Sequence, residues 1–94
     1  MDIAKSNLVE ATAGREKGKL FFVLSEDGEY LLLADGKSRR VEAPKRKKRK
    51  HVRMVGESDC RVANKIRSSE KVTNNELRKA LAAYSEKGNP DREG

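Results

Sequence analysis

The fold is decided by residues 20–36, which read LFFVLSEDGEYLLLADG. Two apolar runs, Leu20–Leu24 and Tyr30–Ala34, are too short for helices and consist of residues that suit a pleated strand. The Asp27-Gly28 pair between them is a strong hairpin signal, because glycine accepts a positive φ. A second pair, Asp35-Gly36, predicts another turn directly after the second run. We therefore expect a β-hairpin at the centre of the fold.

Shorter strand signals lie on both sides of this hairpin. Leu8–Ala11 precedes it and is separated from it by a loop with a glycine at each end. Ser38–Val41 follows the second Asp-Gly pair, and Pro44 is expected to end that strand because proline cannot donate to a ladder. His51–Met54 alternates apolar and polar residues and supplies a fifth strand. Five strands in about fifty residues, joined by tight turns, predict a small β-barrel.

A C-terminal helix over residues 74–87 is predicted by its first turn and by its apolar spacing. Thr73 and Glu76 have the spacing of a capping box. The residues that then recur on one helical face are Leu77, Ala80, Leu81 and Tyr84. Gly88 and Pro90 follow as stop signals.

A helix of this length is marginal in water when isolated, so its apolar face needs a surface to pack on. Two of the predicted strands are apolar on both faces, which predicts that one of these faces is covered. We expect the helix to pack on the outer face of the strands that contain Phe21, Phe22, Leu31 and Leu33.

The chain divides into four expected parts. Residues 1–56 form the barrel and include a basic segment at 37–53. Residues 57–72 form a connector, with a short helix predicted at Asp59–Arg67 from the spacing of Val62 and Ile66. The C-terminal amphipathic helix occupies 73–88, and 89–94 is expected to be a disordered tail.

Composition restricts the class of protein. The chain has 94 residues, 39% of them charged and 35% hydrophobic, which predicts one small domain with a thin core. No apolar run approaches the roughly 18 residues that span a bilayer, and the N-terminus has no apolar stretch of a signal peptide. A single cysteine, Cys60, excludes an internal disulfide framework and, with one histidine, the usual four-ligand zinc site. We expect a reducing, cytoplasmic location, no membrane association and no cofactor.

The positive charge is concentrated in one segment. Residues 37–53 contain ten basic residues and one acidic residue, Glu42, and so carry +9, whereas the rest of the chain carries −2. Such a concentration disfavours the compact state by self-repulsion and indicates a polyanionic partner.

Six consecutive cations form the densest part of this segment: Lys45, Arg46, Lys47, Lys48, Arg49 and Lys50. They lie between Val41 and Val52, both predicted strand residues, so we expect a loop held against the barrel at both ends. A merely solvated loop is the alternative. If about six of these groups neutralise phosphates, the logarithm of affinity falls with the logarithm of salt concentration at a slope of about −4 to −5.

The segment Ala13–Leu20, with Val9 before it and Phe22-Val23-Leu24 after it, resembles a KOW motif. Together with Leu33–Gly36, it is most similar to the KOW proteins of the eukaryotic and archaeal ribosomal protein fourteen, six and twenty-seven group and their small bacterial relatives. The resemblance implies an SH3-like barrel, here with the C-terminal helix on its outer face, and implies that the motif loop contacts RNA. The loop residues are Arg15, Lys17, Gly18 and Lys19. The sequence departs from the family where Ser6 and Asn7 replace a glycine before the first strand.

No catalytic constellation is visible in the sequence. The glycine loop lacks the spacing and the Ser or Thr of a nucleotide-binding P-loop, because three residues separate its glycines and Leu20 follows Lys19. His51 has neither an orienting carboxylate nor a nucleophile nearby in sequence, and Cys60 has no activating neighbour. We therefore expect a protein that is not an enzyme.

The sequence predicts an RNA-binding protein, a ribosomal or ribosome-associated component that is a monomer when free. Its expected partner is structured RNA, above all ribosomal RNA, with ribosomal proteins as a further class. The alternatives are a transcription-associated KOW adaptor that docks on a protein, and a non-specific nucleic-acid-binding protein. The predicted RNA-binding residues are Arg15, Lys17, Gly18, Lys19, Lys37, Arg39, Arg40, Lys45, Arg46, Lys47, Lys48, Arg49, Lys50, His51 and Arg53.

Overall fold

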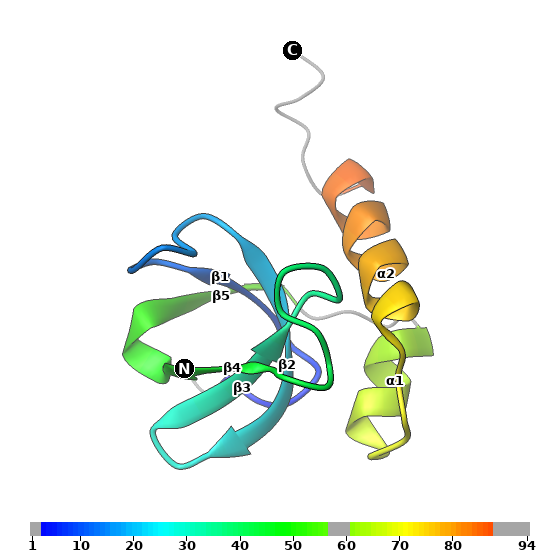
Figure 1. Ribbon diagram of the computed structural model, residues 1–94, viewed down its shortest axis with the longest axis horizontal. Helices are drawn as coiled ribbons and strands as arrows, with labels where there is room; N and C mark the ends of the chain where they lie inside the picture. Colours follow the sequence, from blue (N-terminus) through cyan, green and yellow to red (C-terminus); the bar gives the residue numbers. More distant parts are fainter. Residues whose placement is uncertain (1–2, 57–60, 88–94) are drawn as a thin grey trace.

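The computed structural model describes residues 3–56 and 61–87 and shows an antiparallel sheet with two helices beside it (Figure 1). The elements in chain order are β1 (Leu8–Ala11), β2 (Leu20–Asp27), β3 (Tyr30–Ala34), β4 (Lys45–Lys48), the 3-10 helix η1 (Arg49–His51), β5 (Val52–Gly56), α1 (Arg61–Arg67) and α2 (Asn74–Lys87). The five strands have the spatial order β4-β3-β2-β1-β5. The expectation of a mainly β protein is therefore confirmed.

The sheet is curved but it does not close into a barrel. β4 and β5 form its two edges and do not pair with each other, although the three residues of η1 connect them directly. So short a connection brings one end of β4 near one end of β5, and the sheet must curl to allow this (Figure 1).

The predicted hairpin is confirmed. β3 has the predicted bounds, and β2 begins at the predicted residue but extends three residues further, to Asp27, before a turn at Gly28 and Glu29. The first strand also has its predicted bounds. In the described part of the chain no helix is both long and apolar enough to cross a membrane.

The fourth strand was predicted in the wrong place. Ser38–Val41 belongs to a loop, and the strand is formed by the basic run at Lys45–Lys48. Several backbone N–H groups at residues 37–41 bond to side chains and not to a neighbouring strand. Asp35 Oδ1 accepts hydrogen bonds from the N–H groups of Lys37 (2.8 Å) and Arg39 (2.9 Å), and Asn74 Oδ1 accepts one from Val41 (2.8 Å). Because side chains accept these hydrogen bonds, the segment is more stable as a loop than as a strand.

Apolar side chains alternate between the two faces of the sheet. Phe21 and Val23 belong to an inner core that also contains Ile3, Val9, Ala11, Leu31, Leu33 and Val52. Phe22 points the other way, into an outer core with Leu8, Ala34, Val62, Ala63, Ile66 and Leu77. The helix therefore packs on the outer face of the strands that contain these residues, as expected, although Phe22 points to that face and Phe21, Leu31 and Leu33 face the inner core.

Both helices pack on the outer face of the sheet. α2 has its predicted bounds and its capping box, since the Glu76 N–H donates to Thr73 Oγ1 (3.1 Å) and the Thr73 N–H donates to Glu76 Oε1 (2.9 Å). Further along, the Tyr84 hydroxyl donates to the Val55 carbonyl oxygen of β5 (2.9 Å).

The predicted short helix is α1, which begins at Arg61. Its expected start at Asp59, the residue Cys60, the stop signals Gly88 and Pro90, and the tail at 89–94 lie outside the described residues. The division of the chain into four parts stays a prediction.

Candidate nucleic-acid interface

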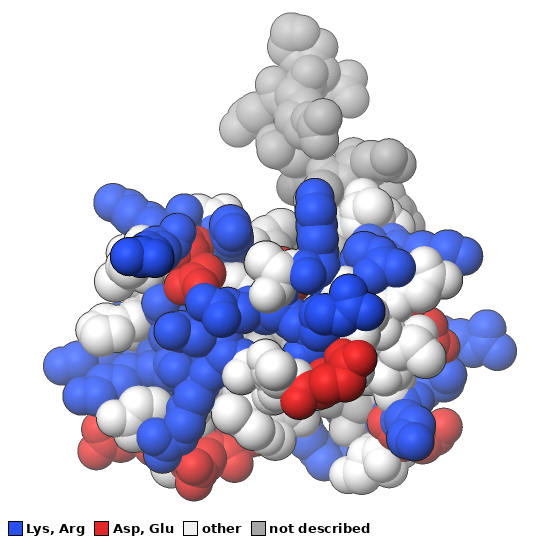
Figure 2. Space-filling view, in the orientation of Figure 1, with Lys and Arg blue, Asp and Glu red and all other residues white. Residues whose placement is uncertain are grey.

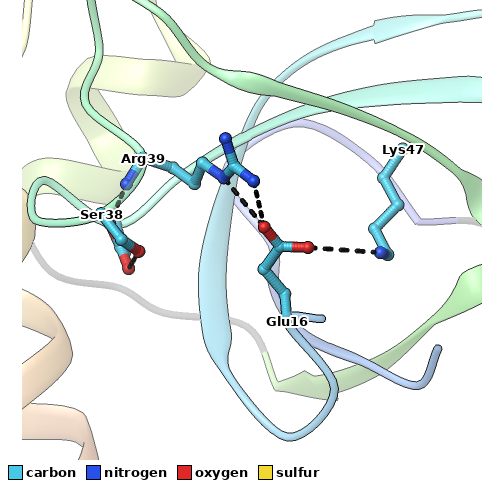
Figure 3. A network of polar contacts seen from close by, with 5 residues as sticks. Glu16, Ser38, Arg39 and Lys47 are labelled. Atoms are coloured by element: carbon cyan, nitrogen blue, oxygen red, sulfur yellow. Dashed lines mark hydrogen bonds and ion pairs between the residues drawn. The ribbon is translucent and has the colours of Figure 1, made fainter. Parts of the chain in front are cut away.

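The β1–β2 loop contains one buried acid, Glu16, which is 7% exposed. Its carboxylate forms an ion pair with the Arg39 guanidinium, whose Nε donates to Glu16 Oε2 at 3.0 Å. The other oxygen, Oε1, lies 3.8 Å from Lys47 Nζ (Figure 3). The hydrogen bond from Arg39 holds the pKa of Glu16 below its ordinary value against the opposing effect of burial, with further help from the charges of Arg39, Lys45 and Lys47.

These contacts connect three segments that are far apart in sequence. Glu16 lies in the β1–β2 loop, Arg39 in the β3–β4 loop and Lys47 in β4. The β1–β2 loop is also braced internally. The Gly18 N–H donates to the Ala11 carbonyl oxygen (2.8 Å), and the Lys19 N–H donates to that of Glu16 (2.8 Å). The loop is therefore held in one place against its neighbours.

β4 accommodates four consecutive cations because its side chains alternate. Lys47 is opposite Leu31 in the register, so it points toward the inner core and is only 8% exposed. Lys45 shares this face, opposite Leu33. Long aliphatic stems cover the edge of the core while the ammonium groups remain near Glu16 or water. β4 is also an edge strand, where lysine disfavours pairing with another chain.

The outer face of β4 carries Arg46 and Lys48 beside Tyr30 of β3. The Arg46 guanidinium lies 3.8 Å from the centre of the Tyr30 ring and 3.3 Å from an Asp27 carboxylate oxygen. Lys48 Nζ is 5.9 Å from the same ring. Tyr30 is thus partly covered by a cation and is not an open platform for a base.

Arg49 has an internal role. Its Nε donates to the Gly28 carbonyl oxygen (2.7 Å), its Nη1 to that of Ile3 (2.7 Å), and its Nη2 to Glu26 Oε1 (2.9 Å). The Arg49 hydrogen bond is the main reason that the pKa of Glu26 is lowered, and the Lys5 N–H adds to the effect. Arg49 therefore joins η1 to the β2–β3 turn and the N-terminal segment.

The remaining predicted residues are more available to a ligand. Five of the cations are exposed and form no ion pair with the described acids: Arg15, Lys17, Lys19, Lys37 and Lys50. Gly18, which lies between Lys17 and Lys19, is also exposed. Lys45 and Lys48 are half-buried. Arg40 has one long contact, 3.9 Å, to the exposed Glu42, and Arg53 pairs with Glu10 at 2.6 Å. His51 is half-buried, and its carbonyl oxygen accepts the Thr12 N–H at 2.8 Å.

Lys and Arg side chains cover much of the molecular face drawn in Figure 2, with fewer acidic side chains among them. The densest cationic run was predicted as a loop held at both ends, but Lys45–Lys48 of this run forms strand β4. The positive surface is built by the β1–β2 loop, the β3–β4 loop and the outward residues of β4, and it is fixed by Glu16. We call these three segments the basic surface.

Sequence reasoning missed two residues of this region, Glu16 and Arg78. Glu16 could have been suspected, because it is a lone acid inside a basic loop. Arg78 lies in α2 but donates from Nη1 to the Gly36 carbonyl oxygen (2.6 Å), a contact between segments that no local pattern indicates.

The basic surface offers lysine and arginine cations, a chemistry that suits phosphate groups. Within the described residues no group of three or more His, Cys, Asp or Glu side chains could hold a metal ion. No family model matches the sequence, and no curated protein matches it either.

Proposed function

We propose that the protein is a non-enzymatic RNA-binding protein that attaches to structured RNA, with ribosomal RNA as its target, through contacts to the phosphate backbone. One observation supports this proposal most strongly. Glu16 binds Arg39 and Lys47 and so holds two cationic loops and a cationic strand together, while the exposed lysines and Arg15 around it form no ion pair with an acid of the described residues. A rigid group of cations without neutralising partners favours a polyanionic ligand.

An SH3-like barrel of the KOW type is the fold that we propose for this module. The strand order and the short η1 connection between the two edge strands support it. Ser6 supports the KOW resemblance as well. It replaces the expected glycine before β1, yet it adopts a φ of 80°, a conformation that glycine adopts without strain.

The shortage of exposed aromatic side chains favours folded RNA over extended single strands. Aromatic residues are 4% of the chain. Phe21 and Phe22 are buried, and Arg46 lies over Tyr30. Recognition of single strands usually needs stacking surfaces, whereas recognition of RNA helices depends on phosphate, the 2′-hydroxyl and shape.

Sedimentation tests the ribosomal target. A tagged full-length chain is expected to migrate with ribosomal particles in a low-salt sucrose gradient and to be released as salt is raised. Protein that remains at the top of the low-salt gradient, with ribosomes present, would count against the proposal.

Competition separates RNA from DNA as the polyanion. A folded RNA fragment is expected to displace a labelled RNA hairpin at lower concentration than duplex DNA of equal charge. Equal displacement would instead show a non-specific nucleic-acid-binding protein, and salt-insensitive capture of a transcription protein would support the adaptor.

A further inference from the structure

We propose that the cleft between the β1–β2 loop, the β3–β4 loop and α2 takes one unpaired nucleotide of the bound RNA. This inference rests on the proposed function and adds a specific ligand feature to it: the RNA site contains a bulged or looped-out nucleotide beside a helix. It also gives α2 a role in binding besides covering the sheet.

The cleft has a volume of about 630 Å³, within the range of pockets that hold small ligands. Lys19, Lys37 and Arg78 supply positive charge from the three different segments around it. Leu20, Leu81 and Ala82 supply apolar surface. Cationic and apolar groups therefore face the same space.

The acidic residue that lines the cleft is engaged within its own loop. Asp35 lines the cleft, but its carboxylate accepts hydrogen bonds from its own loop. The donors are the N–H groups of Lys37 and Arg39 and the Ser38 hydroxyl, which lies 3.1 Å from Asp35 Oδ2. Lys19 and Lys37 form no ion pair with carboxylates of the described residues. An anion that enters the cleft meets two available ammonium groups.

Arg78 is held in a defined position at the cleft. Its Nη1 donates to the Gly36 carbonyl oxygen at 2.6 Å, and its Nη2 contacts Asn75 Oδ1 at 3.5 Å. A guanidinium group has five N–H donors, so these contacts leave others for a phosphate or a base edge. Its planar face is also a surface on which a base can stack.

An unpaired nucleotide matches this arrangement in both of its parts. Its phosphate is an anion for the lysines, and its base presents a flat, weakly polar face to Leu20, Leu81 and the guanidinium plane. A nucleotide inside a helix cannot use the cleft, because its base is stacked and paired. The apolar half of the cleft therefore distinguishes unpaired from paired RNA.

Three synthetic RNAs test this inference with the full-length chain. They are a fully paired hairpin, the same hairpin with a single bulged adenosine, and the bulged hairpin with an abasic residue at the bulge. We expect the adenosine bulge to bind about fivefold more tightly than the other two, the lower end of the range for stacking one base, since the cleft has no aromatic side chain.

Two alanine variants on α2 provide a matched pair. Ala82 lines the cleft, whereas Ala83 is exposed on the same helix and does not. Ala82→Glu is expected to abolish the preference for the adenosine bulge, and Ala83→Glu is expected to keep it, although both add one negative charge. Circular dichroism checks that both variants fold.

Each outcome is decisive. If wild type binds the three RNAs equally, or if both variants keep the preference, the cleft does not take a base, while salt-dependent binding of all three RNAs still supports the proposed function. If wild type binds none of them, the proposed function itself fails, and the inference with it.

Discussion

At the scale of single residues, Gly36 is the glycine at which an added Cβ atom would meet the closest neighbour among the described glycines. It is buried in the β3–β4 loop, its φ is 79°, and a Cβ atom there would lie 2.3 Å from the carbonyl oxygen of Asn74. Neither atom can move cheaply, because the oxygen belongs to the backbone of α2. The tight contact is what allows the β3–β4 loop to lie directly against the start of this helix.

Gly36→Ala is expected to lower the free energy of unfolding by about 2–4 kcal/mol, because the left-handed conformation and the backbone overlap both cost energy. Chemical denaturation measures the loss. Gly28→Ala is the control: its φ is 62°, but a Cβ there meets nothing within 4 Å. We expect it to cost only the conformational part, about 1–2 kcal/mol. Equal losses would show that the contact with Asn74 is unimportant.

Glu16 is the residue that ties the basic surface together, and its lowered pKa makes this effect dependent on pH. A carboxyl group with a lower pKa in the folded state stabilises that state at neutral pH. The stabilisation is lost as the pH falls from the ordinary glutamate pKa of about 4.3 through the lowered value.

Glu16→Gln is therefore expected to cost about 1–2 kcal/mol at neutral pH, a modest value because Arg39 is one-third exposed and water screens the pair. The difference from wild type should disappear in strongly acidic solution. Urea denaturation from pH 7 to about pH 2 measures both. Glu29→Gln removes the same charge from an exposed turn and should change stability by less than about 0.5 kcal/mol. A difference between wild type and Glu16→Gln that persists in acid would contradict the assignment.

At the scale of elements, α1 ends in a turn that usually contains glycine but here contains Ser69. The Glu70 N–H donates to the Lys65 carbonyl oxygen (2.7 Å) and the Ser69 N–H to that of Ile66 (3.0 Å), which is the Schellman pattern. Ser69 has a φ of 60°, the left-handed conformation that this pattern requires.

Ser69→Gly is expected to stabilise the protein by about 0.5–1 kcal/mol, because glycine relieves the strain of the left-handed conformation. The gain is reduced by the loss of the hydrogen bond from Lys5 Nζ to Ser69 Oγ (3.0 Å), which is exposed. Thermal unfolding measures the change. Ser68→Gly is the matched control and should destabilise instead, because residue 68 does not have a positive φ. A loss of stability in Ser69→Gly would argue against the strain.

The basic run at Lys45–Lys50 shows that cations adjacent in sequence have different roles. Lys47 of β4 points inward to Glu16, whereas Lys50, in η1 directly after β4, is exposed. We expect Lys47→Gln to lower stability by about 1 kcal/mol with little change in the salt dependence of RNA binding. Lys50→Gln should keep stability and reduce RNA affinity. Denaturation and fluorescence-anisotropy titration measure the two effects, and the opposite assignment would contradict the observed strand register.

The elements that local signals specify were predicted well from the sequence, and those that depend on distant contacts were not. The hairpin and α2 follow from local signals, namely short apolar runs, Asp-Gly pairs and a capping box, and their predicted bounds were close to correct. Ser38–Val41 was misassigned because its backbone partners include Asn74, which is distant in sequence. The cations could be named from sequence, but which of them point inward depends on pairing between β3 and β4.

At the scale of the whole molecule, the curved sheet and α2 hold the two loops of the basic surface in position. The helices bury the outer core, the capping box starts α2 beside the β3–β4 loop, and Glu16 positions the β1–β2 loop on the other side of it. The curvature of the sheet and the joining of these loops arise from contacts between distant segments, so neither could be predicted from local sequence.

The location of the RNA-binding charge is the central claim, and the salt dependence of binding tests it most directly. If about six exposed cations contact phosphates, the slope of log affinity against log salt concentration is about −4 to −5 for wild type. Replacing Lys17 and Lys19 by glutamine is expected to reduce the steepness of this slope by about 1.5–2, with stability unchanged. Lys5 and Lys71, which line a groove elsewhere on the molecule, give a control with the same loss of charge.

The measurement is therefore a salt titration of RNA-hairpin binding by wild type, Lys17→Gln/Lys19→Gln and Lys5→Gln/Lys71→Gln. A slope that becomes shallower for the first variant and stays at the wild-type value for the second is the predicted result. Identical slopes for all three proteins would contradict the claim that the β1–β2 loop and its neighbours form the RNA-binding surface.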